Sequence, residues 1–162
     1  MKSAYTKLQL IGLTSLRILI GWHFLYEGLY KFFDTSWTAK GFLTNAIGPF
    51  SAFYKYVGSN ATLFEVVDVL NTTGLILIGL SLFIGLFNRI SIIAGILLMF
   101  FYYMAYPPFI GLPIANNVEG HYLIVNKTLI ESMAFFVLLQ FPTSHITGIA
   151  RWFGSRTYRY IS

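Results

Sequence analysis

The residues best suited to chemistry in this sequence are ionisable side chains that recur at helical spacing inside apolar stretches. His23, Glu27 and Lys31 follow one another at intervals of four residues, and Lys127 and Glu131 repeat that interval further along the chain. Side chains four apart are neighbours on one face of an α-helix. Imidazole, carboxylate and ammonium groups in contact can donate, accept and pass protons. The spacing therefore predicts a proton-handling site, with His23, Glu27, Lys127 and Glu131 as its catalytic candidates.

Further polar residues in or beside these stretches are candidates for binding a ligand. At about 100° per residue, Arg17 falls in the same sector of its helix as the three candidates on that helix. Ionisable groups inside hydrocarbon are costly and usually mark function, which predicts an intramembrane polar pocket that opens outward. Ion pairs such as Lys31–Asp68 or Lys127–Glu27, which would only lock the helices together, are the alternative. The binding candidates are Arg17, Lys31, Trp37, Asp68, Asn71, His121, Tyr122 and Asn126.

The composition places these residues in a membrane protein. Apolar residues make up 56%, aromatic residues 19% and charged residues 10% of the 162-residue chain, whereas a soluble domain has about a quarter charged residues. A soluble domain of this size could not bury so much apolar surface, and a disordered chain needs a higher charge. The net charge of +5 is interpreted as a consequence of membrane topology, and we expect no nucleic-acid partner.

The sequence contains no cysteine, which excludes disulfides, iron–sulfur clusters and thiolate nucleophiles. A bis-histidine haem is not expected either. His23 lies mid-span, His121 at the outer start of a span and His145 on the cytoplasmic side, so no two histidines share a depth. The spacing of histidines and carboxylates indicates no metal site. Any redox chemistry therefore needs a non-covalent cofactor or one carried by a partner.

Four apolar segments are each about as long as a bilayer crossing requires: residues 8–33, 66–87, 90–106 and 122–141. They predict an all-α, four-transmembrane-helix bundle over residues 1–142. Basic residues without any acid gather on one side of these crossings, which the positive-inside rule makes cytoplasmic. Both termini are therefore expected in the cytoplasm. The basic residues on this side are Lys2, Lys7, Arg89, Arg151, Arg156 and Arg159.

The segments between and after the spans carry their own signals. Residues 34–65 are rich in aromatic side chains, which predicts one or two short helices at the outer membrane interface, broken at Gly48-Pro49. A tight antiparallel hairpin is predicted around Asn88-Arg89. Residues 143–162 are basic and aromatic, which indicates an amphipathic cytoplasmic tail lying on anionic lipid.

Short motifs follow one another along the chain in a definite order. Those of the first span and the next segment are Leu16-Arg17, Gly21-Trp22, Phe24-Leu25-Tyr26-Glu27-Gly28, Lys31, Ser36-Trp37, Gly41-Phe42-Leu43 and Gly48-Pro49-Phe50. The later ones are Leu70-Asn71, Gly74, Gly79, Gly85-Leu86, Tyr106-Pro107-Pro108, Glu119-Gly120, Val125-Asn126-Lys127 and Leu129-Ile130-Glu131. In order and spacing these motifs resemble the DoxX/DoxD family of membrane proteins, over roughly residues 10–142.

The resemblance implies a four-helix bundle in a prokaryotic cytoplasmic membrane. DoxD-like members are similar to the small subunit of a thiosulfate:quinone oxidoreductase. Other relatives look like membrane partners in oxidative-stress and thiol-redox complexes. The resemblance therefore implies a quinone as the cofactor and a second protein subunit as a partner.

Two functions remain open, and a third ranks below them. In the first, the chain is a quinone-linked oxidoreductase subunit. The side chains of Phe24, Trp37 and Tyr122 would form an apolar slot for the quinone. His23 or Lys127 would donate a hydrogen bond to a quinone carbonyl, and Glu27 and Glu131 would pass protons. In the second, the chain is a non-catalytic membrane partner or homo-oligomer that organises other proteins, and its charges are structural. The third is a small transporter, which would require oligomerisation.

Overall fold

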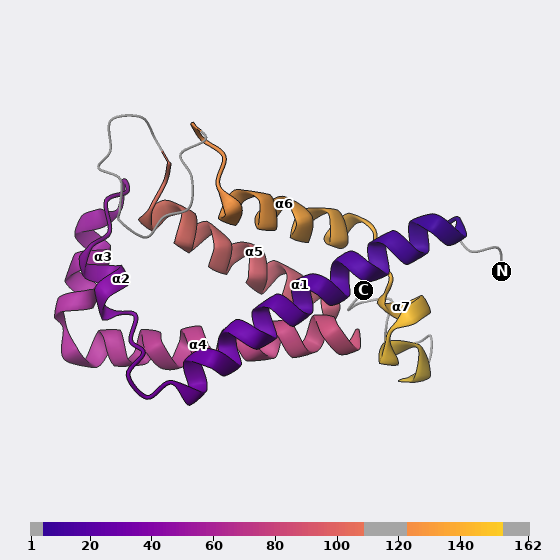
Figure 1. Cartoon of the computed structure of the whole chain (residues 1–162), viewed down its shortest axis with the longest axis horizontal. Coiled ribbons are helices and arrows are strands. Elements are labelled where there is room, and N and C mark those ends of the chain that lie inside the picture. The colour runs from indigo at the N-terminus through magenta and orange to yellow at the C-terminus, as the bar shows by residue number, and fades with distance from the viewer. Residues whose placement is uncertain (1–4, 109–122, 154–162) are drawn as a thin grey trace.

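The computed structural model describes residues 5–108 and 123–153, and every regular element in these two ranges is a helix. The elements in chain order are α1 (Lys7–Phe33), α2 (Lys40–Thr44), α3 (Ser51–Ser59), α4 (Ala61–Ile84), α5 (Asn88–Ala105), α6 (Lys127–Gln140), α7 (Ser144–Thr147) and the 3₁₀-helix η1 (Ile149–Phe153). The long helices α1, α4, α5 and α6 run roughly side by side, and α2 and α3 lie across one end of them (Figure 1).

Side-chain caps fix where three of the long helices begin. The Thr6 hydroxyl accepts a hydrogen bond from the Gln9 amide, and the Gln9 side chain accepts one from the Thr6 amide, so α1 starts with a capping box. Asn60 caps α4 and Asn126 caps α6 through the same kind of side-chain bond. These caps shift two predicted boundaries, because α4 begins at Ala61 rather than at 66 and α6 at Lys127 rather than at 122.

A tight turn joins α4 to α5, where the sequence predicts an antiparallel hairpin. Gly85 ends α4 in the left-handed conformation with φ of 75°, which suits a residue without a side chain. Phe87 follows with φ of 52° and starts α5 without a side-chain cap. Ser81 stabilises the turn, because its hydroxyl donates a hydrogen bond to the Leu86 carbonyl and accepts one from the Ser91 hydroxyl over 2.7 Å.

Glycines allow α1 to pack closely against α4 along most of its length. A Cβ at Gly21 would lie 2.6 Å from the Phe83 nitrogen, and one at Gly28 would lie 2.8 Å from the Ile76 nitrogen. On α4, a Cβ at Gly79 would meet the Leu25 backbone. Small residues that let helix backbones approach in this way are typical of membrane helix interfaces.

We expect Gly79→Ala to lower the free energy of unfolding in detergent by about 1–3 kcal/mol, because the added methyl group forces α1 away from α4. The matched control is Gly74→Ala on the same helix, where a Cβ would meet nothing within 4 Å. That change should leave stability unaltered or slightly higher, since alanine is the better helix former. Equal losses in the two variants would contradict this account of the α1–α4 contact.

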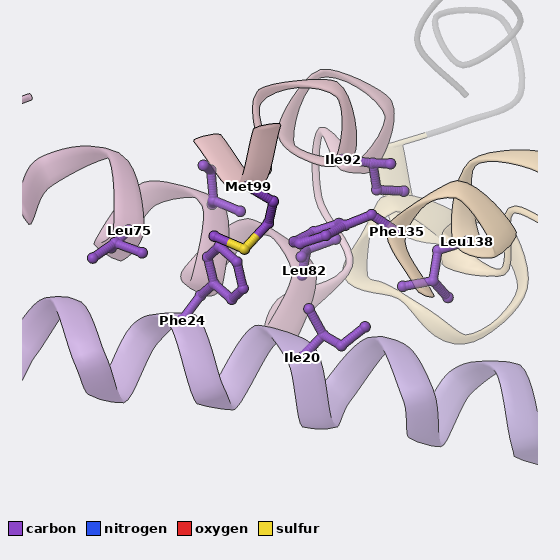
Figure 2. Packing of buried hydrophobic residues seen from close by; sticks show 9 residues of the cluster. Ile20, Phe24, Leu75, Leu82, Ile92, Met99, Phe135 and Leu138 are labelled. Atoms are coloured by element: carbon purple, nitrogen blue, oxygen red, sulfur yellow. The ribbon is translucent and has the colours of Figure 1, made fainter. Parts of the chain in front are cut away.

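One apolar core joins the four long helices. It is built from nine buried side chains: Ile20, Phe24, Leu75, Ile78, Leu82, Ile92, Met99, Phe135 and Leu138. Figure 2 shows Phe24 of α1 reaching toward Met99, with Phe135 and Leu82 beside them. The Phe24 and Phe135 rings meet edge to face with centroids 5.0 Å apart, the favoured geometry for an aromatic pair.

Within residues 5–108 and 123–153, three helices are long and apolar enough to cross a bilayer: Lys7–Phe33, Ala61–Ile84 and Asn88–Ala105. Many apolar side chains on the outer faces of these helices are exposed, Leu19, Leu77 and Leu97 among them, and such faces suit contact with lipid. The predicted fourth span contains α6, whose 14 residues rise about 21 Å at 1.5 Å per residue. The described part of this segment is therefore shorter than a full crossing of about 30 Å.

The short helices α2 and α3 occupy the segment 34–65, for which one or two short helices are expected, and the chain between them contains Gly48-Pro49. They pack around a second apolar cluster with the end of α5. The Tyr54 hydroxyl donates to the Phe101 carbonyl over 2.8 Å, and burial raises the pKa of this phenol, which keeps it protonated as a donor. The two helices therefore form a fixed cover over one end of the bundle.

Candidate functional site

The histidine and the carboxylates predicted from the sequence meet where α1 faces α6. The Nε2 atom of His23 lies 3.2 Å from Oε1 of Glu131 on α6 and 3.8 Å from Oε2 of Glu27, one turn further along α1. The other oxygen of Glu27 lies 2.8 Å from Nζ of Lys31. The three residues of α1 thus form the ladder that their four-residue spacing predicts, and Glu131 joins this ladder from the neighbouring helix.

The ladder continues through neutral groups into α4 and α5. Lys31 donates from Nζ to Oδ1 of Asn71 over 3.2 Å, and Nδ2 of Asn71 donates to the Tyr102 hydroxyl over 2.5 Å. Six side chains from four helices are therefore linked in sequence: Glu131, His23, Glu27, Lys31, Asn71 and Tyr102. We call this set the polar chain. The titratable members His23, Glu27 and Glu131 can exchange protons with a bound group, whereas the Asn71 carboxamide holds Lys31 and Tyr102 in place through hydrogen bonds.

The two ends of the polar chain differ in exposure. The Lys31 side chain is only 12% exposed, and its ammonium group lies 4.7 Å from the centroid of the Trp37 ring, in a cation–π contact. By contrast the His23 side chain is 40% exposed and that of Glu27 is 37% exposed, while Glu131 is 19% exposed. One end is thus enclosed and the other is open along the line where α1 meets α6.

Helix register sets the depth of the open end. His23 lies ten residues before the end of α1 at Phe33, which corresponds to about 15 Å at 1.5 Å per residue. This distance is about half the thickness of the hydrocarbon layer. If the outer end of α1 lies at the membrane surface, the open end of the polar chain lies near the middle of the bilayer.

Several predicted binding residues have structural partners outside the polar chain. The Asp68 carboxylate accepts a hydrogen bond from the Ala39 amide over 2.7 Å, so it anchors the start of α2, and Lys31 pairs with Glu27 instead of with Asp68. Asn126 is the buried N-cap of α6. Lys127, a predicted catalytic residue, is exposed and forms no ion pair with a described residue, and Glu27 pairs with Lys31. His121 and Tyr122 lie outside the described residues.

Arg17 lies away from the polar chain, toward the end of the bundle that carries the α4–α5 turn. Its side chain is 2% exposed, and it donates to the Thr143 hydroxyl over 3.2 Å. A Cβ at Gly85 would lie 3.2 Å from the guanidinium group. Arg17 therefore sits between the C-terminal ends of α4 and α6, where unpaired carbonyl groups carry partial negative charge. This position favours a structural role over contact with a ligand at His23.

Two features of the site differ from what the sequence predicts. Tyr102 joins the polar chain although it was not a candidate, and the only signal for it is a phenol inside an apolar span, which usually needs a hydrogen-bond partner. Phe24 was expected to line an apolar slot, but it is 1% exposed and belongs to the core. Trp37 does lie at the site, against Lys31.

A groove of about 350 Å³ lies elsewhere, beside the α4–α5 turn. It is lined almost entirely by apolar side chains of α4, α5 and the turn, with Ser81 and Ser91 as its polar members. Those two hydroxyls are hydrogen-bonded to each other. Because this lining has no titratable group, the groove is not the place for the chemistry that the polar chain can perform.

Comparisons of the chain with models of protein families, with curated proteins and with solved structures found no match. The resemblance to the DoxX/DoxD family therefore stays a prediction from the motifs, and the functional argument depends on the geometry of the site.

Proposed function

We propose that the chain is a quinone-linked subunit of a membrane oxidoreductase, and that a quinone head group binds at the open end of the polar chain. The observation that carries this proposal is the series of six polar side chains that runs from Glu131 on α6 through half-exposed His23 and Glu27 to Tyr102 on α5. Half-exposed charged groups inside an apolar span are costly without a polar partner. A quinone has a head group with polar carbonyls, which suits these charged groups, and an apolar tail, which suits the apolar surface around them.

Each residue of the open end suits one requirement of such a ligand. Quinone carbonyl oxygens accept hydrogen bonds, and reduction of a quinone to a quinol consumes two electrons and two protons. A protonated His23 would donate from Nδ1, because Nε2 already faces both carboxylates. Glu27 and Glu131 would pass protons to the bound head group, and Lys31 holds the Glu27 carboxyl group in position through its 2.8 Å contact. The electrons must come from a partner subunit or a diffusible donor, since no cysteine in the chain can carry a redox centre.

We further propose the membrane arrangement that this role implies, with four crossings and both termini in the cytoplasm of a prokaryote. The placement of the helices supports it: Lys7 starts α1, Arg89 follows the α4–α5 turn and Arg151 lies in η1, and these three segments gather at the same end of the bundle (Figure 1). Basic residues at one end of a bundle favour the cytoplasmic side.

Quinone binding to the purified protein tests the proposal. We expect wild-type protein in detergent to bind ubiquinone or menaquinone at one per chain. The Glu27→Gln/Glu131→Gln variant should bind at least tenfold more weakly, because both carboxylates that contact Nε2 of His23 and would pass protons are lost. Glu65→Gln is the matched control, since Glu65 is exposed on α4 and lies outside the polar chain. Equal affinity in all three proteins would count against the site.

The second candidate function is that of a non-catalytic membrane partner. The same half-exposed side chains favour it, provided that another protein covers them. His23 and Glu27 would then pair with groups of that protein across its interface. Lys127→Met distinguishes the two functions, because Lys127 is exposed and unpaired with any described residue. Loss of a co-purifying protein without loss of quinone binding would favour the partner role.

A further inference from the structure

The contact between α1 and α6 is the weakest contact between neighbouring long helices of the bundle. α1 packs extensively on α4, and α5 packs extensively on α6, but α1 meets α6 at few points. Two of the contacts that cross from α1 to α6 are the 3.2 Å pair of His23 with Glu131 and the edge-to-face rings of Phe24 and Phe135. We call this line of contact the α1–α6 seam. A seam with so few contacts is easier to part than the close backbone packing of α1 on α4.

Two other routes to the polar chain are closed. From the outer end, the enclosed Lys31 lies beneath Trp37, and α2 is held in place over this region by the bond from Ala39 to Asp68. From the other end of the bundle, the core stands in the way, with Phe24, Leu82 and Phe135 at most 1% exposed (Figure 2). The seam is therefore the side on which the polar chain is open.

The surface beside the seam is apolar and faces the surroundings of the bundle. Leu19 lies one turn before His23 on α1 and is 66% exposed, and Tyr30 lies three residues after Glu27. Residues three and four apart on a helix are neighbours. The half-exposed charges thus sit next to a stretch of helix that lipid chains would cover.

The geometry points to the α1–α6 seam as the entrance through which a quinone with a long apolar tail reaches the polar chain sideways from the bilayer. Its head would lie against His23, Glu27 and Glu131, and its tail would lie along Leu19 on the surface of α1. This inference rests on the proposed quinone function and adds to it the route and the class of ligand, a lipid-tailed quinone as opposed to a water-soluble one.

A thiol placed beside the seam tests the inference, because the natural chain has no cysteine that would interfere. Leu19→Cys puts the thiol where the tail should lie. Leu97→Cys is the matched control, since Leu97 is likewise an exposed leucine near the middle of its helix, α5. Each variant, reconstituted in phospholipid vesicles, is treated with N-ethylmaleimide alone, together with decylubiquinone, or together with duroquinone, a tail-less quinone whose ring is fully substituted and so does not add to the thiol through an open ring position. Binding of decylubiquinone is measured separately.

We expect decylubiquinone to slow the labelling of Leu19→Cys at least threefold, duroquinone to leave it unchanged, and neither to affect Leu97→Cys. Labelling of Leu19→Cys beforehand should weaken decylubiquinone binding. If decylubiquinone binds and both thiols react at unchanged rates, the entrance is elsewhere and the quinone function stands. If duroquinone protects as well as decylubiquinone, the tail does not lie at the seam. If neither quinone binds to the protein, the entrance and the proposed function both fail.

Discussion

Replacing Lys31 with methionine is expected to lower the free energy of unfolding in detergent by about 2 kcal/mol, because its ammonium group is the hub of the polar chain. Lys31 contacts Glu27 at 2.8 Å, donates to Asn71 and lies over the Trp37 ring. Its loss leaves Glu27 without its strongest partner and Asn71 without a donor. Glu27 is 37% exposed, so the loss is smaller than for a fully buried ion pair.

A double-mutant cycle separates the ion pair from the rest of this effect. The Lys31→Met/Glu27→Gln variant should be less destabilised than the sum of the two single variants, because the second change removes the carboxylate that the first leaves unpaired. Lys55→Met on α3 is the control, since Lys55 is exposed, and it should change stability by less than about 0.5 kcal/mol. Additive effects of the two single changes would mean that the contact between Lys31 and Glu27 does not stabilise the fold.

Replacing Arg17 with alanine is expected to destabilise the protein by about 3 kcal/mol, because the change leaves a cavity where a large buried side chain stood. Thr143 also loses the hydrogen-bond donor that it has at 3.2 Å. Arg17→Met keeps most of the packing volume and loses only the charge and this bond, so we expect a smaller loss of about 1 kcal/mol. Chemical unfolding of the two variants in detergent measures the difference.

Quinone affinity of the Arg17→Met variant decides between a structural and a binding role for this residue. The structure places Arg17 at the ends of α4 and α6, against Thr143 and Gly85, away from the open end of the polar chain. The affinity should therefore equal that of the wild type. A loss of quinone affinity of tenfold or more would show that Arg17 contributes to quinone binding, as its position in the sequence predicts.

The part of the site that lies within one helix could be predicted from the sequence. The contacts of His23 with Glu27 and of Glu27 with Lys31 follow from their four-residue spacing, because an α-helix brings such side chains together whatever it packs against. Contacts between helices could not be predicted in this way. Asp68 was a plausible partner for Lys31, but the rotation of α4 presents Asn71 to Lys31 and leaves Asp68 to hold the Ala39 amide.

The fold shows the same division between local and long-range information. Apolar stretches predicted the three long spanning helices, because length and hydropathy are properties of each segment alone. The starts of α4 and α6 were misplaced, because a single asparagine side chain sets each of them. The packing of α1 on α4 depends on how Gly21 and Gly79 face each other, and nothing in one helix shows which glycine of another it will meet.

The account depends on one claim, that the open end of the polar chain binds a quinone. The most direct test is to purify the protein gently from its own membranes and to measure, by mass spectrometry, the quinone that comes with it. We predict one quinone per chain in the wild type and in Glu65→Gln, and little or none in Glu27→Gln/Glu131→Gln. A cooperative thermal unfolding transition of the double variant shows that it is folded. Wild-type protein without quinone but with a stoichiometric protein partner would contradict the claim and favour the non-catalytic role.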